Sequence, residues 1–145
     1  MRYLKSAIAL TAMVFLAGAT AAAADAVTYV SKDKVAAAMA KGGPLASGSD
    51  YIVSVSRRDK GGSSEVHDNE TDTFYIMEGA ATFVTGGTMV DAKTSGPGQS
   101  RGSGITGGTS HALSKGDVIT IPKGTPHWFK EVPKLVVYYV VKSKH

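Results

Sequence analysis

The sequence contains no cysteine, which excludes disulfide bridges and metal sites built on thiolates. Charged residues make up only 19% of the chain and form no basic cluster with interleaved aromatics, so nothing indicates a nucleic-acid-binding protein. The apolar stretch from Ala7 to Gly18 is shorter than the roughly 20 residues that a transmembrane helix needs. Glycine is abundant instead, with 17 residues, and this favours a protein of strands and turns over a helical bundle.

The first 24 residues have the pattern of a secretory signal peptide. Arg2 and Lys5 precede the apolar stretch, and an alanine-rich run follows it. Cleavage fits best after Ala24, with a position two residues later as the alternative. Removal of the signal takes two of the 16 basic residues, which leaves a net charge of +2 against the 12 acidic residues. We therefore expect a periplasmic or secreted protein that is not bound to a membrane once the signal is removed.

The rest of the chain predicts one short helix followed by many short strands. Ser31 can cap a helix that Gly42, Gly43 and Pro44 would end, within an N-terminal extension over residues 25–50. From Tyr51 onward the apolar residues alternate, with turns rich in glycine and proline. Strands are expected near residues 51–55, 64–69, 73–77, 81–84, 118–121, 127–132 and 135–142. We predict an all-β sandwich or barrel over residues 51–145.

The segment from Gly86 to Gly108 is rich in Gly, Ser and Thr, and three interpretations stay open: a solvated loop, a β-arm, or a lid over the barrel mouth. Its glycines at 102, 104 and 107 match the dinucleotide-binding fingerprint, but the strand before it and the helix after it are missing. We therefore expect no nucleotide cofactor. Arg101, the only arginine of the segment, is a candidate for contacting an anionic ligand.

Two histidines and a carboxylate are candidate metal ligands. His67 and Asn69 would share one face of a strand, because side chains alternate along it. Asp72 begins the next strand, and His127 follows a proline-rich turn. If these groups converge inside a barrel, they suit a divalent transition metal such as Fe, Mn, Ni, Cu or Zn. The spacing alone leaves their convergence open.

These residues lie in two segments that resemble the two sequence motifs of the cupin superfamily. The second motif is matched at its spacing by Gly116, Pro122, Gly124 and His127, with Glu131 in place of its final asparagine. The first motif is matched at His67 and Gly79, with Asp72 in the position of its glutamate. The sequence departs from the first motif in two ways, because Asn69 stands in the place of the second histidine and the gap from there to the carboxylate is one residue short.

The resemblance implies a cupin-type double-stranded β-helix, that is, a jelly-roll barrel, with one short N-terminal helix added here. It further implies a metal held by His67, Asp72 and His127, with Asn69 in place of the missing histidine. His111, just before the second motif, is a possible substitute ligand.

The ligand pocket of such a barrel would be lined by residues that share faces with these groups. The candidates are Phe74, Phe129, Glu131, His111 and Arg101. Together with the signal peptide, the resemblance implies an exported small cupin that acts on or binds a small molecule. As an enzyme it would be a metal-dependent oxygenase, isomerase or lyase. The alternatives are a non-catalytic ligand-binding module that has lost its metal, or a partner-binding protein.

The last strand is apolar on both faces from Val136 to Val141. This pattern is typical of a strand that is buried on both sides. Because cupins often dimerise, we expect a homodimer.

Overall fold

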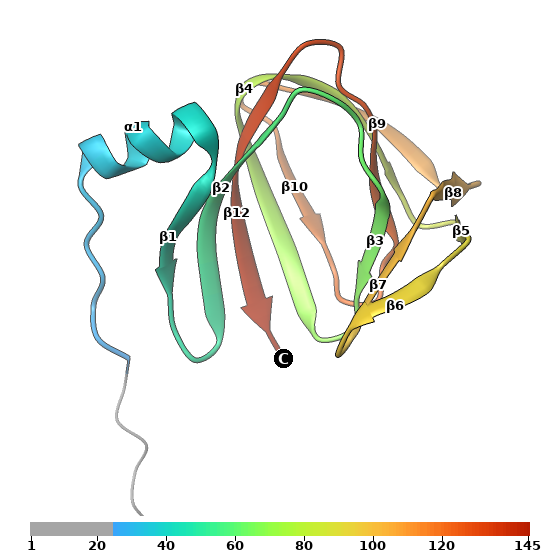
Figure 1. The fold of residues 1–145 in the computed structure, drawn as a ribbon, viewed down its shortest axis with the longest axis horizontal. Coiled ribbons are helices and arrows are strands. Elements are labelled where there is room, and N and C mark those ends of the chain that lie inside the picture. Colours follow the sequence, from blue (N-terminus) through green and yellow to red (C-terminus); the bar gives the residue numbers. More distant parts are fainter. Residues whose placement is uncertain (1–24) are drawn as a thin grey trace, which may run out of the picture.

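The computed structural model describes residues 25–145, which form a β-rich domain with one short helix (Figure 1). The predicted all-β class with a single N-terminal helix is therefore confirmed. The predicted signal peptide, residues 1–24, lies outside the described residues. Within residues 25–145, no helix is both long enough and apolar enough to cross a membrane.

The elements follow one another closely along the chain. In order they are α1 (Lys32–Lys41), β1 (Gly43–Ser47), β2 (Tyr51–Arg58), β3 (Ser64–His67), β4 (Glu70–Thr85), β5 (Thr88–Val90), β6 (Lys93–Gly96), β7 (Gln99–Gly102), β8 (Gly104–Thr106), β9 (Thr109–Ser114), β10 (Val118–Ile121), β11 (His127–Glu131) and β12 (Val136–Lys144).

Strand β4 belongs to two sheet layers and joins them. Its first half pairs with β12 and β10, and its second half pairs with β11 and β9. One layer therefore runs β1-β2-β12-β4-β10, and the other runs β6-β7-β3-β11-β4-β9. The two layers face each other in the manner of a jelly roll (Figure 1).

The change of layer occurs at Gly79, where the sequence predicted a break between two separate strands. Gly79 has a positive φ of 77°, and a Cβ at this position would overlap the carbonyl oxygen of Leu135. The register of β4 against β12 shifts close to this point. A single bent strand thus replaces the two strands that we predicted.

The main core lies between the two layers. Its fully buried members include Ile76 and Phe83 from β4, and Val136 and Tyr138 from β12. The apolar residues on the inward face of β12 are therefore explained by their burial in this core.

Helix α1 covers part of the outward face of β12. Ser31 caps its first turn by accepting a hydrogen bond from the Lys34 amide, and Gly42 ends it, as the sequence predicted. The buried Ala38 packs against Val55 of β2 and Val137 of β12.

The glycine-rich segment 86–108 forms four short strands, β5 to β8. Strands β6 and β7 pair with each other, and β7 extends the second layer next to β3. Strands β5 and β8 form a separate two-stranded sheet. Of the three interpretations, the structure matches a β-arm that is part of the barrel wall.

Candidate functional site

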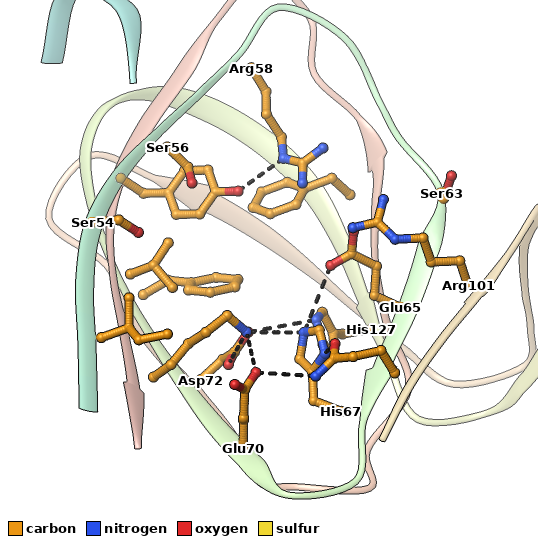
Figure 2. Close-up of a pocket in the computed structure, with 17 residues that line it drawn as sticks. Ser54, Ser56, Arg58, Ser63, Glu65, His67, Glu70, Asp72, Arg101 and His127 are labelled. Atoms are coloured by element: carbon orange, nitrogen blue, oxygen red, sulfur yellow. Dashed lines mark hydrogen bonds and ion pairs between the residues drawn. The ribbon is translucent and has the colours of Figure 1, made fainter. Parts of the chain in front are cut away.

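A cavity of about 370 Å³ opens between the two layers. It is lined by alternate residues of β2, β3, β4, β7, β11 and β12, so each strand contributes its inward face. Most of these side chains are polar or charged, unlike those of the core beside it (Figure 2). The charged and imidazole groups of the lining are Arg58, Glu65, His67, Glu70, Asp72, Arg101, His127 and Lys142.

The two predicted histidines meet in this cavity. His67 is the last residue of β3 and His127 is the first of β11, and these strands are paired neighbours. Their ring centroids lie 5.1 Å apart, and both residues are buried. The Gly124 amide, in the turn before β11, donates a hydrogen bond of 2.7 Å to the His67 carbonyl. The positive φ of Gly124, 75°, permits this turn, so the second motif is held against the first.

Both imidazoles are oriented by hydrogen bonds through Nδ1. His67 Nδ1 donates to Oε1 of Gln99, and His127 Nδ1 donates to the carbonyl of Thr125 at 3.1 Å. These acceptors place the Nδ1 proton, so each neutral ring presents the lone pair of Nε2 to the cavity. An imidazole whose other nitrogen is held by an oxygen is the usual arrangement of a metal-ligating histidine.

Carboxylates surround the two Nε2 atoms. Oδ2 of the buried Asp72 lies 3.4 Å from His67 Nε2 and 3.9 Å from His127 Nε2. Glu65, two residues before His67 on the same face of β3, places Oε2 3.8 Å from His67 Nε2. Two overlapping groups, Glu65–His67–His127 and His67–Glu70–Asp72, each bring three possible ligand atoms within 4.8 Å of one another.

Two cationic side chains already contact these carboxylates. Lys142 Nζ donates to both oxygens of Asp72, at 2.7 and 2.9 Å, and lies 3.2 Å from Glu70 Oε2. Arg101, at the exposed rim, pairs with Glu65 at 3.0 Å. The acidic groups of the cluster are therefore partly neutralised by the protein itself.

The environment moves the pKa values of the cluster in different directions. Burial acts to lower the pKa of His67, but the contacts with Asp72 and Gln99 outweigh burial and raise this pKa above 6.5. Burial lowers the pKa of His127 below the same value. Burial acts to raise the pKa of Asp72, but the His67 and Lys142 contacts outweigh it and lower this pKa below 3.8. Asp72 is therefore ionised and His127 neutral near pH 7.

The structure brings together part of the predicted site. His67, Asp72 and His127 converge, and Phe74, Phe129 and Arg101 line the same cavity. Phe74 and Phe129 stack with their centroids 5.9 Å apart and form its apolar wall.

Three predicted residues lie outside the cavity lining. Strand β3 ends at His67, before the expected 69, so the face alternation stops there and Asn69 lies exposed in the following turn. His111 on β9 hydrogen-bonds to Thr85 at 2.8 Å, and Glu131 is exposed at the end of β11. Asn69 does not occupy a ligand position, because the chain reverses between β3 and β4.

The structure adds residues that the sequence interpretation did not place in the site: Arg58, Glu65, Gln99 and Lys142. A signal for Glu65 was present, because it shares a face with His67. Gln99 could not be found in this way, because it comes from the glycine-rich segment.

Comparisons with known proteins agree with the fold. A family model described as cupin matches residues 33–145. Many solved structures match, and the following three have TM-scores of 0.50 to 0.52. A conserved Streptococcus pyogenes protein of unknown function, SPY1581, has a TM-score of 0.50 and 16% identity over 72% of this chain and 73% of that one. The Schizosaccharomyces pombe Cnp3 cupin domain has a TM-score of 0.52 and 13% identity over 72% and 60% of the two chains. Streptomyces PAC13, solved with uridine, has a TM-score of 0.51 and 10% identity over 71% and 68%. No curated protein sequence matches.

The fold is a two-layer jelly roll, and histidines and carboxylates face its interior. The chain belongs to the cupin family, since the family model covers most of the sequence. At these low identities the solved structures show the fold alone, and function has to be argued from the cavity.

Proposed function

We propose that this cupin holds a divalent transition metal in its barrel and uses it to bind or transform a small molecule. The observation that carries the proposal is the pair of imidazoles. Both have Nδ1 held by an oxygen, and both direct Nε2 toward Asp72. Glu65 would complete the set of ligands with a second carboxylate.

The residues present fit such a metal. His67 Nε2 is buried and has no hydrogen-bond partner, although Asp72 lies 3.4 Å away. A buried polar atom without a partner costs free energy, and coordination would satisfy it. Imidazole nitrogens and carboxylate oxygens, without thiolates, suit Fe, Mn, Ni, Cu or Zn. The bound metal would supply Lewis-acid polarisation of a substrate oxygen.

The proposal covers a metal-dependent oxygenase, isomerase or lyase. The chain's own residues would hold and orient the substrate beside the metal ligands, against the wall of Phe74 and Phe129. Glu70 lies next to the cluster and accepts a hydrogen bond of 3.4 Å from Gln99 Nε2. We propose Glu70 as the group that exchanges protons with a substrate, and its place beside the cluster supports this role.

A second candidate function, a metal-free binding module, is favoured by Lys142. Its ammonium group contacts both oxygens of Asp72 and so supplies a positive charge beside the proposed ligands. In this alternative the lysine replaces the metal, and the cavity only captures a ligand. The two candidates differ in whether Asp72 exchanges Lys142 for a metal ion.

Metal analysis of the purified protein separates the two candidates. We expect near-stoichiometric transition metal in the wild type and none in His67→Ala/His127→Ala. Lys142→Met frees Asp72 and should bind metal about tenfold more tightly, because a charge-assisted hydrogen bond no longer competes. Lys144→Met, an exposed lysine on the same strand, is the matched control and should behave like the wild type.

If the wild type stays metal-free after incubation with Fe, Mn, Ni, Cu and Zn, the metal proposal fails and the binding module is favoured. Metal uptake by Lys142→Met alone would show that the lysine has replaced the metal.

We also propose that the protein is exported to the periplasm or the medium. The support is the charged, apolar and alanine-rich order of residues 1–24. Mass spectrometry of the protein from its source cells should give an N-terminal peptide that begins at Asp25. An intact Met1 in the mature protein would contradict export by cleavage.

A further inference from the structure

One cationic side chain of the cavity is not used by the metal proposal. Arg58, the last residue of β2, lies at the end of the cavity opposite Glu70 and Asp72 (Figure 2). Its Nε donates to the hydroxyl of Tyr138 at 2.9 Å, and its guanidinium carbon lies 4.9 Å from the ring centroid of Phe129. These two contacts hold the guanidinium group in a fixed place.

Arg58 differs from the other cations of the lining in its partners. Arg101 pairs with Glu65, and Lys142 pairs with Glu70 and Asp72. Within residues 25–145, no carboxylate forms an ion pair with Arg58. A half-buried guanidinium with remaining N–H groups is a site for an oxyanion, because its planar fork matches two oxygens.

The neighbouring positions are small and polar. On the inward face of β2, Ser54 and Ser56 precede Arg58, at positions where a barrel core would carry large apolar side chains. Gly62 also leaves room, since a Cβ there would lie 2.8 Å from Nη1 of Arg58. These serine hydroxyl groups can hydrogen-bond to a ligand bound at the guanidinium.

We propose that the cavity takes a small hydroxy- or oxo-carboxylate, with the carboxylate on Arg58 and the hydroxyl or oxo oxygen toward His67 and His127. The other cations of the cavity, Lys142 and Arg101, already pair with carboxylates of the protein, so Arg58 is the group that fixes the direction of the ligand. Phe74 and Phe129 lie between the two ends of the cavity and pack against the carbon skeleton of the ligand. The volume of about 370 Å³ limits the ligand to a small molecule.

A carboxylate fits better than a phosphate. Arg58 is a single cation, it has no carboxylate partner in the described part of the chain, and it forms two parallel hydrogen bonds most readily with a planar group. The doubly charged phosphate would need a second cation, and the other two cations that line the cavity, Arg101 and Lys142, are paired with Glu65 and Asp72. This inference rests on the proposed ligand pocket but not on its metal.

The test uses a ligand pair that differs only in charge. Mandelate and its neutral amide, mandelamide, are titrated by calorimetry into the purified protein, before and after dialysis against a chelator. Phosphate and lactate are titrated in parallel. In the dialysed protein we expect mandelate to bind about tenfold to a hundredfold more tightly than mandelamide, as a bidentate charged contact implies.

Two substitutions assign the preference to Arg58. Arg58→Gln should remove the preference by weakening the binding of mandelate about tenfold to a hundredfold and that of mandelamide far less, and Arg58→Lys should restore only part of the preference. Arg57→Gln is the matched control, because Arg57 is the exposed neighbour on β2 and does not line the cavity. Circular dichroism confirms that each variant is folded before its titration is interpreted.

The outcomes separate this inference from the metal proposal. A mandelate preference that depends on Arg58 in a protein that never binds metal supports the carboxylate site while the metal proposal fails. Equal binding of mandelate and mandelamide, tighter binding of phosphate, a preference that survives in Arg58→Gln, or no binding of either carboxylate would each overturn the inference.

Discussion

At the scale of single residues, strand parity decides which groups face the cavity. Glu65 and His67 share a face of β3, and both reach the cluster. Asn69 would share that face only if the strand continued, but β3 ends at His67. His67, Asp72 and His127 could be found from the motifs. Asn69 was expected on the same face as His67, but the alternation of side chains does not show where a strand ends, and β3 ends before Asn69.

Lys142 and Gln99 could not be predicted from the motifs, because they lie far from them in the sequence. Lys142 follows Tyr138 and Val140 on the inward face of β12. The apolar sequence of this strand predicts only core residues. Its contact with Asp72 depends on the pairing of β12 with β4. Groups of this kind become visible only when the register of the sheet is known.

The opposite pKa shifts of the two histidines predict how metal retention depends on pH. A metal needs Nε2 unprotonated, and the raised pKa of His67 means that this ring gains its proton first as the pH falls. His127, whose pKa is lowered by burial, remains neutral at that pH. The apparent metal affinity should therefore begin to weaken as the pH falls below the pKa that His67 has in the metal-free protein, which lies above 6.5.

Proton NMR titration of the metal-free protein checks this order. One imidazole should titrate above 6.5 and disappear in His67→Ala, and another should titrate below 6.5 and disappear in His127→Ala. The reverse order, or a shared midpoint near 6.5, would contradict the electrostatic description of the cluster.

At the scale of elements, the bend of β4 controls the position of the site. The first half of β4 carries Asp72 and Phe74, and its second half pairs with β11, which carries His127. The sequence predicted strands on both sides of Gly79, but could not show that they are one strand. A glycine between two stretches of alternating residues is compatible with a turn between two strands and with a bend within one strand. Only the pairing of the strand with both layers distinguishes the bend from the turn.

We predict that Gly79→Ala strongly destabilises the protein. The alanine would have to adopt a positive φ, which costs about 1–2 kcal/mol, and its Cβ would also overlap the carbonyl of Leu135. Gly107→Ala is a matched control, since Gly107 has a φ of 70° but nothing within 4 Å of a Cβ. Urea unfolding should show a loss of roughly 1 kcal/mol for Gly107→Ala and at least about 2 kcal/mol more for Gly79→Ala. Equal losses would show that the overlap is relieved by movement of the β11–β12 connection.

At the scale of the whole molecule, the outward face of the first layer remains partly apolar. Tyr75 is 46% exposed and Val118 is 62% exposed, and the two are directly paired across β4 and β10. On its other side Tyr75 is paired with Tyr139 of β12, which packs against the cluster formed by Ala38 of α1, Val55 and Val137. Helix α1 thus covers the part of this face over Val137 and leaves the row at Tyr75 open.

This row supports the prediction of a homodimer, which followed from the apolar last strand. A second copy that packs on Tyr75 and Val118 would bury side chains that are exposed in one chain. Size-exclusion chromatography with light scattering should then give twice the mass of one chain. Val118→Asp places a charge in the interface and should yield monomers, whereas Thr106→Asp, an exposed position on β8 in the separate two-stranded sheet, should remain dimeric. If the wild type is a monomer at working concentrations, Tyr75 and Val118 form no interface between copies of the chain. The apolar character of β12 is then explained by the barrel core and helix α1 alone.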